Sequence, residues 1–283
     1  LSVVRDEHAI ARLGKGVDLN RVIAPETFHR VSECLQEYKK SSDECGSKRI
    51  IACGTSALRD ARNQSEFIAF IRDTLGVEII VLTGDEEAEL TYGGAVSDFL
   101  ESERKQQFAV LDIGGGSTEL IKGIDSSVKS KVSVDIGSVR LTEKFLKTSP
   151  PPSLGVSQAL SFIRSQVLPF GPLSSTARLI GVAGTLTTLA SIDLGLPSFE
   201  RNKVNGHVLT YDAVHTILNR LRIKTLDELK SVPQIVPERA DILLAGILIL
   251  LETMKHVNAN EITVSDKGLR YGILLKELRG TKP

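Results

Sequence analysis

The chain has 283 residues, of which 41% are hydrophobic and 25% are charged, the balance of an ordinary globular protein. Its formal net charge is zero, which argues against any general attraction to nucleic acid or to a membrane surface. A chain of this length is long for one hydrophobic core, so two domains are expected.

The remaining composition points to the cytoplasm. The longest apolar run, residues 242–251, is too short to span a membrane and is predicted to be a buried helix. The first residues lack the long apolar region of a signal peptide. Three cysteines without metal-type spacing fit a reducing compartment, and five scattered histidines give little support for a zinc site.

Strands and helices alternate along the chain, which predicts an α/β fold. After two short strands near the start, the expected elements are, in chain order, a helix over 25–40, a strand over 49–53, a helix over 55–75, a strand over 77–82, a helix over 85–100, a strand ending at 112, strands over 118–123 and 128–136, a helix over 138–147, a helix ending near 167, a strand over 179–183, a helix over 185–193, a strand over 261–265 and a closing helix over 269–279. The rest of the second half is predicted to be helical.

The most informative segment is 108–121, where an apolar run ends in Asp112, three glycines follow at 114–116, and a second strand-like run begins. This pattern predicts a hairpin with glycines at its tip. Consecutive glycines leave backbone N–H groups uncovered, so a phosphate-sized anion could bind between Asp112 and Glu119. The two carboxylates are placed as ligands of a phosphate-bound Mg²⁺ would be. A tight turn without a ligand is the alternative, which glycine would also serve.

Two other strand-to-helix corners carry charged side chains. Arg59 falls in the first turn of the helix expected over 55–75, where the helix dipole disfavours a cation. It is therefore expected to face an anion, unless it is a solvated surface side chain. Glu86 and Glu87 fall in the first turn of the next helix, as routine complements to its dipole would. They lie about 100° apart around the helix, so at most one of them faces a given cleft.

Two later corners are also polar. At Gly184 and Thr185 a strand passes into a helix, whose N-terminal N–H groups could hold a second anion. Residues 262–272 turn the last strand into the closing helix and include Arg270. Because several strand ends carry glycine and polar residues, a ligand cleft is expected across the ends of the sheet.

The two halves of the chain repeat one plan of hairpinned strands, a helix, a strand and a helix. The second half opens with the glycine hairpin, whereas the first half has no counterpart to it. A missing N-terminal segment of roughly fifteen to twenty residues, at about 3.3 Å per strand residue enough for one hairpin, is therefore expected. Duplicated halves also predict two lobes that face a cleft.

Together these segments resemble the Ppx/GppA family, the exopolyphosphatases and guanosine pentaphosphate phosphohydrolases, over essentially the whole chain. The segments that carry the resemblance are residues 55–59, 84–88, 112–120, 181–185 and 265–270. The glycine segment alone would indicate only the superfold. The paired glutamates followed by Ala88, together with residues 237–241, make the resemblance specific to the family.

The resemblance implies an actin-like, sugar-kinase-like fold, which is a duplicated α/β architecture of two ribonuclease H-like lobes with an interdomain cleft. Residues 1–88 together with 268–283 would form the first lobe, without its first hairpin, and residues 89–267 the second. The family's first phosphate loop and the C-terminal helical domains of longer relatives are not found in this sequence, which resembles the short, two-domain form. Tyr271 stands where the family commonly has a glutamate, so no role is carried over to it.

The resemblance also implies the roles of the site residues. Glu87 would be the catalytic base, and Asp112 with Glu119 would hold Mg²⁺, for which Mn²⁺ could substitute. The glycine loop would cradle the terminal phosphoryl group. The full set of expected phosphate-binding residues is Arg59, Gly114, Gly115, Gly116, Ser117, Gly184, Thr185 and Arg270.

The expected activity is Mg²⁺-dependent hydrolysis of a phosphoanhydride, which releases the terminal phosphate of inorganic polyphosphate or of guanosine pentaphosphate. An ATP-dependent kinase of the same superfold is one alternative, although a kinase needs no glutamate base aimed at water. A non-catalytic sensor of polyphosphate or alarmone is another, and the retention of Glu87, Asp112 and Glu119 argues against it. Besides the substrate, a second copy of the chain is an expected partner, because dimers are the commonest soluble oligomers.

Overall fold

The structure is a computed structural model that describes residues 3–7, 9, 11–14, 16–101 and 105–280. The chain divides into two compact units, Leu1–Glu87 (unit 1) and Ala88–Pro283 (unit 2), and each is described by itself. The closing helix groups with unit 2. The expected lobe boundaries, which place residues 268–283 with the first lobe, stay a prediction.

Unit 1 is built from helices around one short parallel pair of strands. Its elements are α1 (Val17–Asn20), α2 (Pro25–Glu44), β1 (Ala52–Gly54), α3 (Ser56–Arg59), α4 (Gln64–Leu75), β2 (Ile79–Val81) and the first residues of α5 (Gly84–Val96). The strands pair in register from Ala52 opposite Ile79 to Gly54 opposite Val81. Phe28 of α2 meets Phe67 of α4 edge to face, with ring centroids 5.1 Å apart, and this contact lies in the unit's apolar core.

Two expectations for unit 1 are wrong. Among the described residues ahead of α2 no strand forms, and the chain makes the single turn of α1 instead. The helix expected over 55–75 is broken into α3 and α4. The break has a tertiary cause: the Asn63 side chain accepts a hydrogen bond from the Ile23 N–H and donates one to the Ile23 carbonyl, both at 2.9 Å. An asparagine held in this way favours a turn over a continuing helix.

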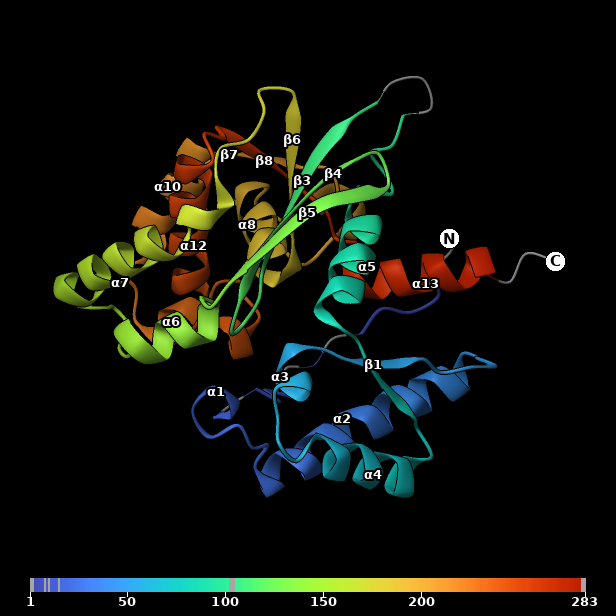
Figure 1. Cartoon of the computed structure of the whole chain (residues 1–283). Helices are drawn as coiled ribbons and strands as arrows, with labels where there is room; N and C mark the ends of the chain where they lie inside the picture. Colours follow the sequence, from blue (N-terminus) through green and yellow to red (C-terminus); the bar gives the residue numbers. More distant parts are fainter. Residues whose placement is uncertain (1–2, 8, 10, 15, 102–104, 281–283) are drawn as a thin grey trace. The chain divides into compact units, whose positions relative to one another are not determined.

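Unit 2 is built on a six-stranded mixed sheet (Figure 1). The strands are β3 (Gln107–Ile113), β4 (Thr118–Ile124), β5 (Ser127–Val134), β6 (Ala177–Val182), β7 (Val208–Thr210) and β8 (Glu261–Val264). Their order is β5-β4-β3-β6-β8-β7; β3, β6 and β8 run parallel, and the other neighbours are antiparallel. The antiparallel strand β7 forms one edge of this sheet. The strand β7 was not expected from the sequence, because it has only three residues and forms through its hydrogen bonds to β8, which is far away in the chain.

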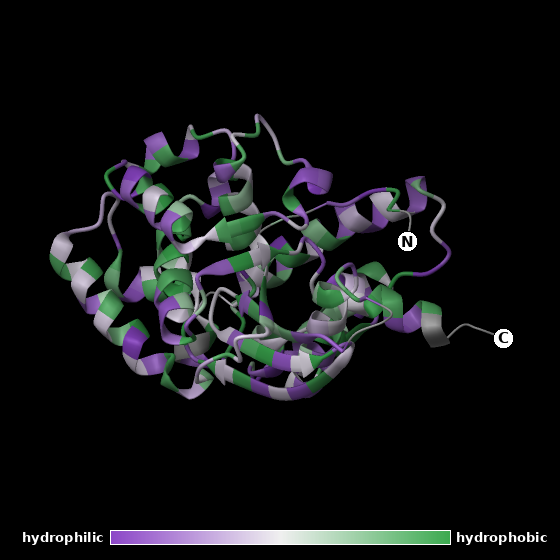
Figure 2. Ribbon diagram, turned by 90° about the horizontal axis from the view of Figure 1, so that it is seen from above, coloured by the Kyte–Doolittle hydropathy of each residue, from purple (hydrophilic) through white to green (hydrophobic). Residues whose placement is uncertain are grey.

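The helices of unit 2 account for most of its core. They are α6 (Ser138–Phe145), α7 (Ser153–Gln166), α8 (Ala183–Asp193), α9 (Arg201–Val204), α10 (Tyr211–Leu221), α11 (Leu226–Lys230), α12 (Leu243–His256) and α13 (Leu269–Gly280), with short 3-10 turns at η1 (Leu168–Phe170) and η2 (Pro237–Arg239). Figure 2 shows polar and apolar residues interspersed along the helices, as in helices that bury one side.

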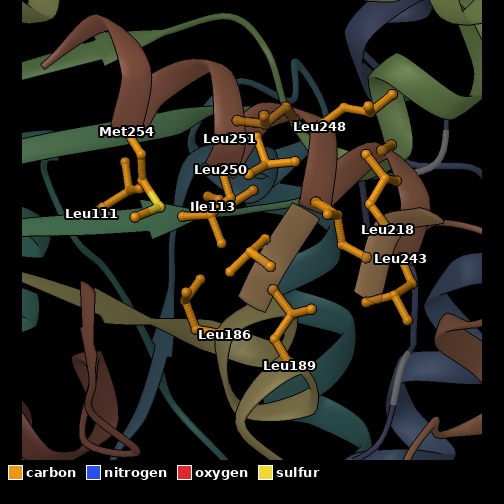
Figure 3. Packing of buried hydrophobic residues seen from close by; sticks show 14 of the residues in the cluster. Leu111, Ile113, Leu186, Leu189, Leu218, Leu243, Leu248, Leu250, Leu251 and Met254 are labelled. Carbon is orange, nitrogen blue, oxygen red and sulfur yellow. The ribbon is translucent and has the colours of Figure 1, made fainter. Parts of the chain in front are cut away.

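Helix α12 is the exception, because nearly all of it is buried, as the apolar run over 242–251 predicts. Figure 3 shows Leu250 and Met254 of α12 beside Leu111 of β3, with Leu186 of α8 in the same cluster. In the described part of the chain, no helix combines the length and the apolar character needed to cross a membrane.

Helices α5 and α13 cross at glycines (Figure 1). A Cβ atom added at Gly272 would lie 1.8 Å from the carbonyl oxygen of Leu90, and one at Gly94 would lie 2.3 Å from that of Gly268. No real side chain tolerates such distances, so the two helix backbones touch directly at this crossing. The start of α13 is therefore held tightly against α5.

Candidate functional site

Three of the predicted polar segments of unit 2, those that follow β3, β6 and β8, lie at the same edge of the sheet. Asp112 at the end of β3 pairs with Val182 at the end of β6, and Gly181 of β6 pairs with Val264 at the end of β8. Because the three strands are parallel, their carboxyl ends lie side by side. The glycine loop, the start of α8 and the start of α13 follow these ends. The structure thus brings the predicted phosphate-binding residues of unit 2 to one sheet edge.

The glycine hairpin forms as the sequence predicts. Strands β3 and β4 pair antiparallel, and Asp112 lies directly opposite Glu119. Side chains on directly opposite residues share one face of the sheet, with Cβ atoms about 4.5–5.5 Å apart. The turn between them closes through a 3.0 Å hydrogen bond from the Gly114 N–H to the Ser117 carbonyl. The Ser133 hydroxyl donates to Glu119 Oε1 at 2.7 Å and orients that carboxylate.

The donor set at this hairpin suits Mg²⁺. Across the described residues, no group of three or more His, Cys, Asp or Glu side chains is placed to enclose a metal ion. Magnesium seldom needs one, because it is commonly bound through one or two carboxylates together with water and substrate phosphates. Two half-buried carboxylates opposite each other beside a glycine loop match that mode. The expected metal ligands Asp112 and Glu119 stay a prediction that the geometry supports.

An arginine from η2, which is not among the predicted site residues, packs against the start of α8. Arg239 of η2 packs against Gly184 so closely that a Cβ atom there would lie 0.9 Å from its Nη1. Burial lowers the pKa of Arg239 from its ordinary value, as it does for a cation removed from water. Glycine at 184 leaves room for this guanidinium in its present position, which a larger residue would make it leave. No local pattern in the sequence connects these two residues, since they lie on different elements.

The residues on either side of Gly184, Ala183 and Thr185, are also constrained by the fold. Ala183 has a left-handed φ of 71°, a strained conformation for a residue with a side chain, and such strain clusters at functional sites. The Thr185 side chain is buried against α12, because a Cβ atom on Gly246 would lie 2.4 Å from its Oγ1. Any contact of Thr185 with an anion would therefore use its backbone N–H rather than its hydroxyl.

In unit 1, the predicted base and a predicted phosphate-binding cation contact each other. Arg59 Nη1 donates to Glu87 Oε2 at 3.1 Å and to the Leu82 carbonyl at 2.7 Å. Both side chains are about 30% exposed, at 32% for Arg59 and 29% for Glu87. Arg59 lies in a helix first turn, as expected, but α3 is only that one turn long, so Arg59 is also its last residue. A cation there is near both ends of the short helix, so the helix dipole does not indicate its role, and its contact with Glu87 is the more informative observation.

The two glutamates at the start of α5 have separate roles. Glu86 Oε2 accepts hydrogen bonds from both the N–H and the hydroxyl of Thr83, each at 2.9 Å, and Thr83 Oγ1 accepts from the Glu86 N–H at 3.2 Å. This is a reciprocal capping box. Glu87 instead contacts Arg59, so the two glutamate side chains point to different partners.

Arg270, the remaining predicted residue, is exposed on the first turn of α13. The next residue, Tyr271, is buried, with the Arg201 guanidinium carbon 4.9 Å and the Lys267 Nζ 5.7 Å from its ring centroid. Arg201 also forms an ion pair with Asp266, whose pKa is raised by burial. A buried polar cluster thus anchors the β8–α13 corner that carries Arg270.

The chain is similar to proteins of known family over nearly its whole length. The sequence profile of the Ppx/GppA phosphatase family matches residues 1–280. Exopolyphosphatase 2 of Mycobacterium tuberculosis is 32% identical over 284 aligned residues, which cover 96% of this chain and 88% of that protein. A guanosine-5'-triphosphate,3'-diphosphate pyrophosphatase of Vibrio atlanticus is 28% identical and covers 93% of this chain, but the match spans only 51% of that protein.

Solved structures agree with this similarity. The crystal structure of the Aquifex aeolicus Ppx/GppA family member has a TM-score of 0.82 and 30% identity, and the match covers 100% of this chain and 91% of that one. An exopolyphosphatase from Cytophaga hutchinsonii has a TM-score of 0.84 and 27% identity, with 95% and 88% of the two chains covered. The expected α/β fold is therefore confirmed.

Proposed function

The chain belongs to the Ppx/GppA phosphatase family, and we propose that it is a Mg²⁺-dependent phosphoanhydride hydrolase that releases the terminal phosphate of inorganic polyphosphate or of guanosine pentaphosphate. The observation that carries this proposal is the pairing of Asp112 opposite Glu119 across a glycine loop at the carboxyl edge of the sheet. The two substrates are suggested by the relatives, an exopolyphosphatase and a guanosine-5'-triphosphate,3'-diphosphate pyrophosphatase.

The proposed chemistry assigns two kinds of role to the predicted residues. Hydrolysis of a phosphoanhydride needs charge stabilisation around the transferring phosphoryl group and a carboxylate that orients water. In unit 2, the backbone N–H groups of the glycine loop and the start of α8 are the donors proposed to hold phosphate oxygens. In unit 1, Glu87 is the carboxylate proposed to take the proton of the attacking water, and Arg59 is the cation proposed to contact substrate phosphate.

Asp112 and Glu119 would hold Mg²⁺, which when bound supplies positive charge against the phosphate oxygens. Because Mg²⁺ and Mn²⁺ both prefer oxygen ligands, Mn²⁺ is expected to support activity. The Ser133 hydroxyl keeps Glu119 Oε1 hydrogen-bonded at 2.7 Å and so limits its rotation. Arg270, exposed at the same sheet edge, is proposed to meet phosphates farther from the reacting one.

The test is a comparison of phosphate release from long-chain polyphosphate, guanosine pentaphosphate and ATP, with and without Mg²⁺, using Glu87→Gln as the inactive control. Mg²⁺-dependent release from either of the first two substrates supports the proposal. Tight binding of both without release would indicate a sensor instead. Transfer of phosphate from ATP to an acceptor, without release from polyphosphate, would indicate a kinase.

A further inference from the structure

We propose that the start of α6 is a positioning element for the phosphate loop. Its backbone N–H groups hold the carbonyl groups of Gly114 and Gly115 and thereby turn the N–H groups of Gly115 and Gly116 toward the bound anion. The inference rests on the proposed function, because it takes the glycine loop to be the phosphate site. It assigns a role to residues 137–140, which lie on another element than the loop.

The loop carbonyls serve as the N-terminal cap of α6. The Ser138 N–H donates to the Gly114 carbonyl at 2.9 Å, and the Ser138 hydroxyl donates to the same oxygen at 3.2 Å. The N–H groups of Val139 and Arg140 both donate to the Gly115 carbonyl, at 2.9 and 3.1 Å. The first N–H groups of a helix have no partner within the helix. Here the glycine loop provides those partners, since the residue at the cap position, Gly137, has no side chain to do so.

This arrangement determines where the donors of the loop point. In a trans peptide, the C=O of one residue and the N–H of the next lie in one plane and point in opposite directions. When the carbonyls of Gly114 and Gly115 point at α6, the N–H groups of Gly115 and Gly116 must point away from it. Gly115 is exposed and Gly116 is half-buried, so that side of the loop is accessible.

The same contacts also strengthen those donors. A peptide group whose carbonyl accepts a hydrogen bond is polarised, and its N–H becomes a better donor. The carbonyls here accept from the positive end of a helix dipole, which acts in the same direction. Helix α6 is therefore proposed to act on the phosphate through the loop without touching it.

The packing leaves no room for another arrangement. A Cβ atom added at Gly137 would lie 2.3 Å from both the carbonyl carbon and oxygen of Gly115, and 2.5 Å from the Gly116 nitrogen. The Thr118 hydroxyl, at the start of β4, donates to the Ile136 carbonyl at 2.6 Å and ties the hairpin to the same corner. Backbone therefore lies against backbone at this point, and only glycine fits at 137.

The test removes the donors that hold one loop carbonyl. Ser138→Pro takes away both the N–H and the hydroxyl that donate to the Gly114 carbonyl, and it sets the proline Cδ in place of the amide hydrogen, so this carbonyl must turn away from α6. The substitution falls at the first position of a helix, where the proline φ is compatible with the fold. Gly137 has φ −146° and ψ 169°, an extended conformation compatible with a following proline. The dissociation constant for inorganic phosphate should rise at least about three- to tenfold, the effect expected when one or more hydrogen bonds that hold the loop are lost. The amide shifts that phosphate induces at Gly115 and Gly116, measured by NMR on the full chain, should shrink with it.

Two matched variants separate this effect from general damage. Ser138→Ala removes only the hydroxyl donor and keeps the N–H, so its dissociation constant should rise less than that of Ser138→Pro, and the difference between the two variants measures the N–H. Ser153→Pro makes the same exchange at the first position of α7, where Pro152 is likewise extended, and should leave the dissociation constant unchanged.

The outcomes distinguish the inference from the proposed function. If phosphate leaves the NMR amide signals of Gly115 and Gly116 unshifted in the wild type, the loop is not the phosphate site and the proposed function is contradicted. If phosphate shifts both of these amide signals in the wild type and binds Ser138→Pro with the same dissociation constant, the positioning role proposed for the start of α6 is wrong. Should Ser138→Pro not fold, the wild type decides the question: phosphate should slow hydrogen exchange at the Val139 and Arg140 amides, and unaltered exchange would contradict the inference.

Discussion

The guanidinium of Arg59 lies 3.1 Å from the carboxylate of Glu87. One nitrogen of Arg59, Nη1, makes this contact and also donates to the Leu82 carbonyl. Because a single nitrogen serves both, the rest of the planar guanidinium fork is not used by these two bonds, and Arg59 is suited to hold the carboxylate and a phosphate at once. The proposed base is thus held in place by the proposed phosphate-binding cation.

Replacing Glu87 with Gln should lower turnover by about 10²–10⁴, the usual effect of losing a general base, while substrate binding persists. The matched control is Glu86→Gln. Glutamine also serves in a capping box, so this control should retain most of the activity. Steady-state rates of phosphate release measure both variants, and equal losses would show that the start of α5, rather than the base, had been disturbed.

Arg59→Ala should raise KM for polyphosphate, and the increase should be larger at low salt, because screening weakens charge contacts at high salt. Arg72→Ala is the control, since Arg72 lies exposed on α4 and pairs with the neighbouring Asp73. Its KM should not change. Titrations of KM against ionic strength measure both, and a KM for Arg59→Ala that matches the wild type at every salt concentration would return Arg59 to a structural role as the partner of Glu87.

Asp112→Asn should raise the Mg²⁺ concentration needed for half-maximal activity, because one anionic ligand becomes a neutral one. Asp135→Asn is a suitable control, since Asp135 is a highly exposed carboxylate whose partner is Arg140. Its Mg²⁺ requirement should equal that of the wild type. Full wild-type activity in excess chelator would remove the metal role from Asp112 and Glu119.

Replacement by alanine should lower the free energy of unfolding less at Gly184 than at Gly272. Gly184→Ala displaces the end of the Arg239 side chain, which can rotate, so unfolding free energy should fall by only about 1–2 kcal/mol while phosphate affinity drops. Gly272→Ala drives Cβ into the backbone carbonyl of Leu90, so the loss should be at least about 3 kcal/mol. Denaturant unfolding compares them. Equal destabilisation would mean that Arg239 is as rigid as a helix backbone.

The buried cluster beside α13 should give opposite pH effects from two aspartates. Burial raises the pKa of Asp266 in the folded state, so its ionisation costs stability as pH rises above its ordinary value of 3.8. Asp266→Asn should therefore gain stability relative to the wild type as the pH is raised through that range. Urea unfolding between pH 3 and 7 measures the difference, and a pH-independent difference would show that the Asp266 carboxylate titrates normally.

Asp98 supplies the contrasting case. Burial raises its pKa, but hydrogen bonds from Lys267 and Asn205 lower it and prevail, so the pKa lies below its ordinary value. The stability that this carboxylate contributes is present above its unfolded-state pKa and is lost as pH falls through the folded one. Asp98→Asn should therefore be less stable than the wild type at neutral pH, and the gap should narrow on acidification. A gap that widens in acid would contradict the assigned direction.

The glycine hairpin and the alternation of strands and helices could be predicted from the sequence, because they depend on near neighbours. Apolar runs on both sides of consecutive glycines specify two strands and a turn whatever surrounds them. The register that sets Asp112 opposite Glu119 follows from that turn. The buried helix over 242–251 was likewise determined by its unbroken apolar run.

Only the tertiary structure decided which residues contact one another at the candidate site and around it, because these contacts join residues that lie far apart in the chain. Asn63 bonds to Ile23 at the point where the expected helix is interrupted, so Arg59 lies in the single turn of α3 rather than in a long helix. Arg239 packs on Gly184 from another element. The start of α6 caps itself on the carbonyls of the glycine loop. Such contacts leave no periodicity in the sequence, since each depends on backbone groups that every residue carries and on space that only the folded chain defines.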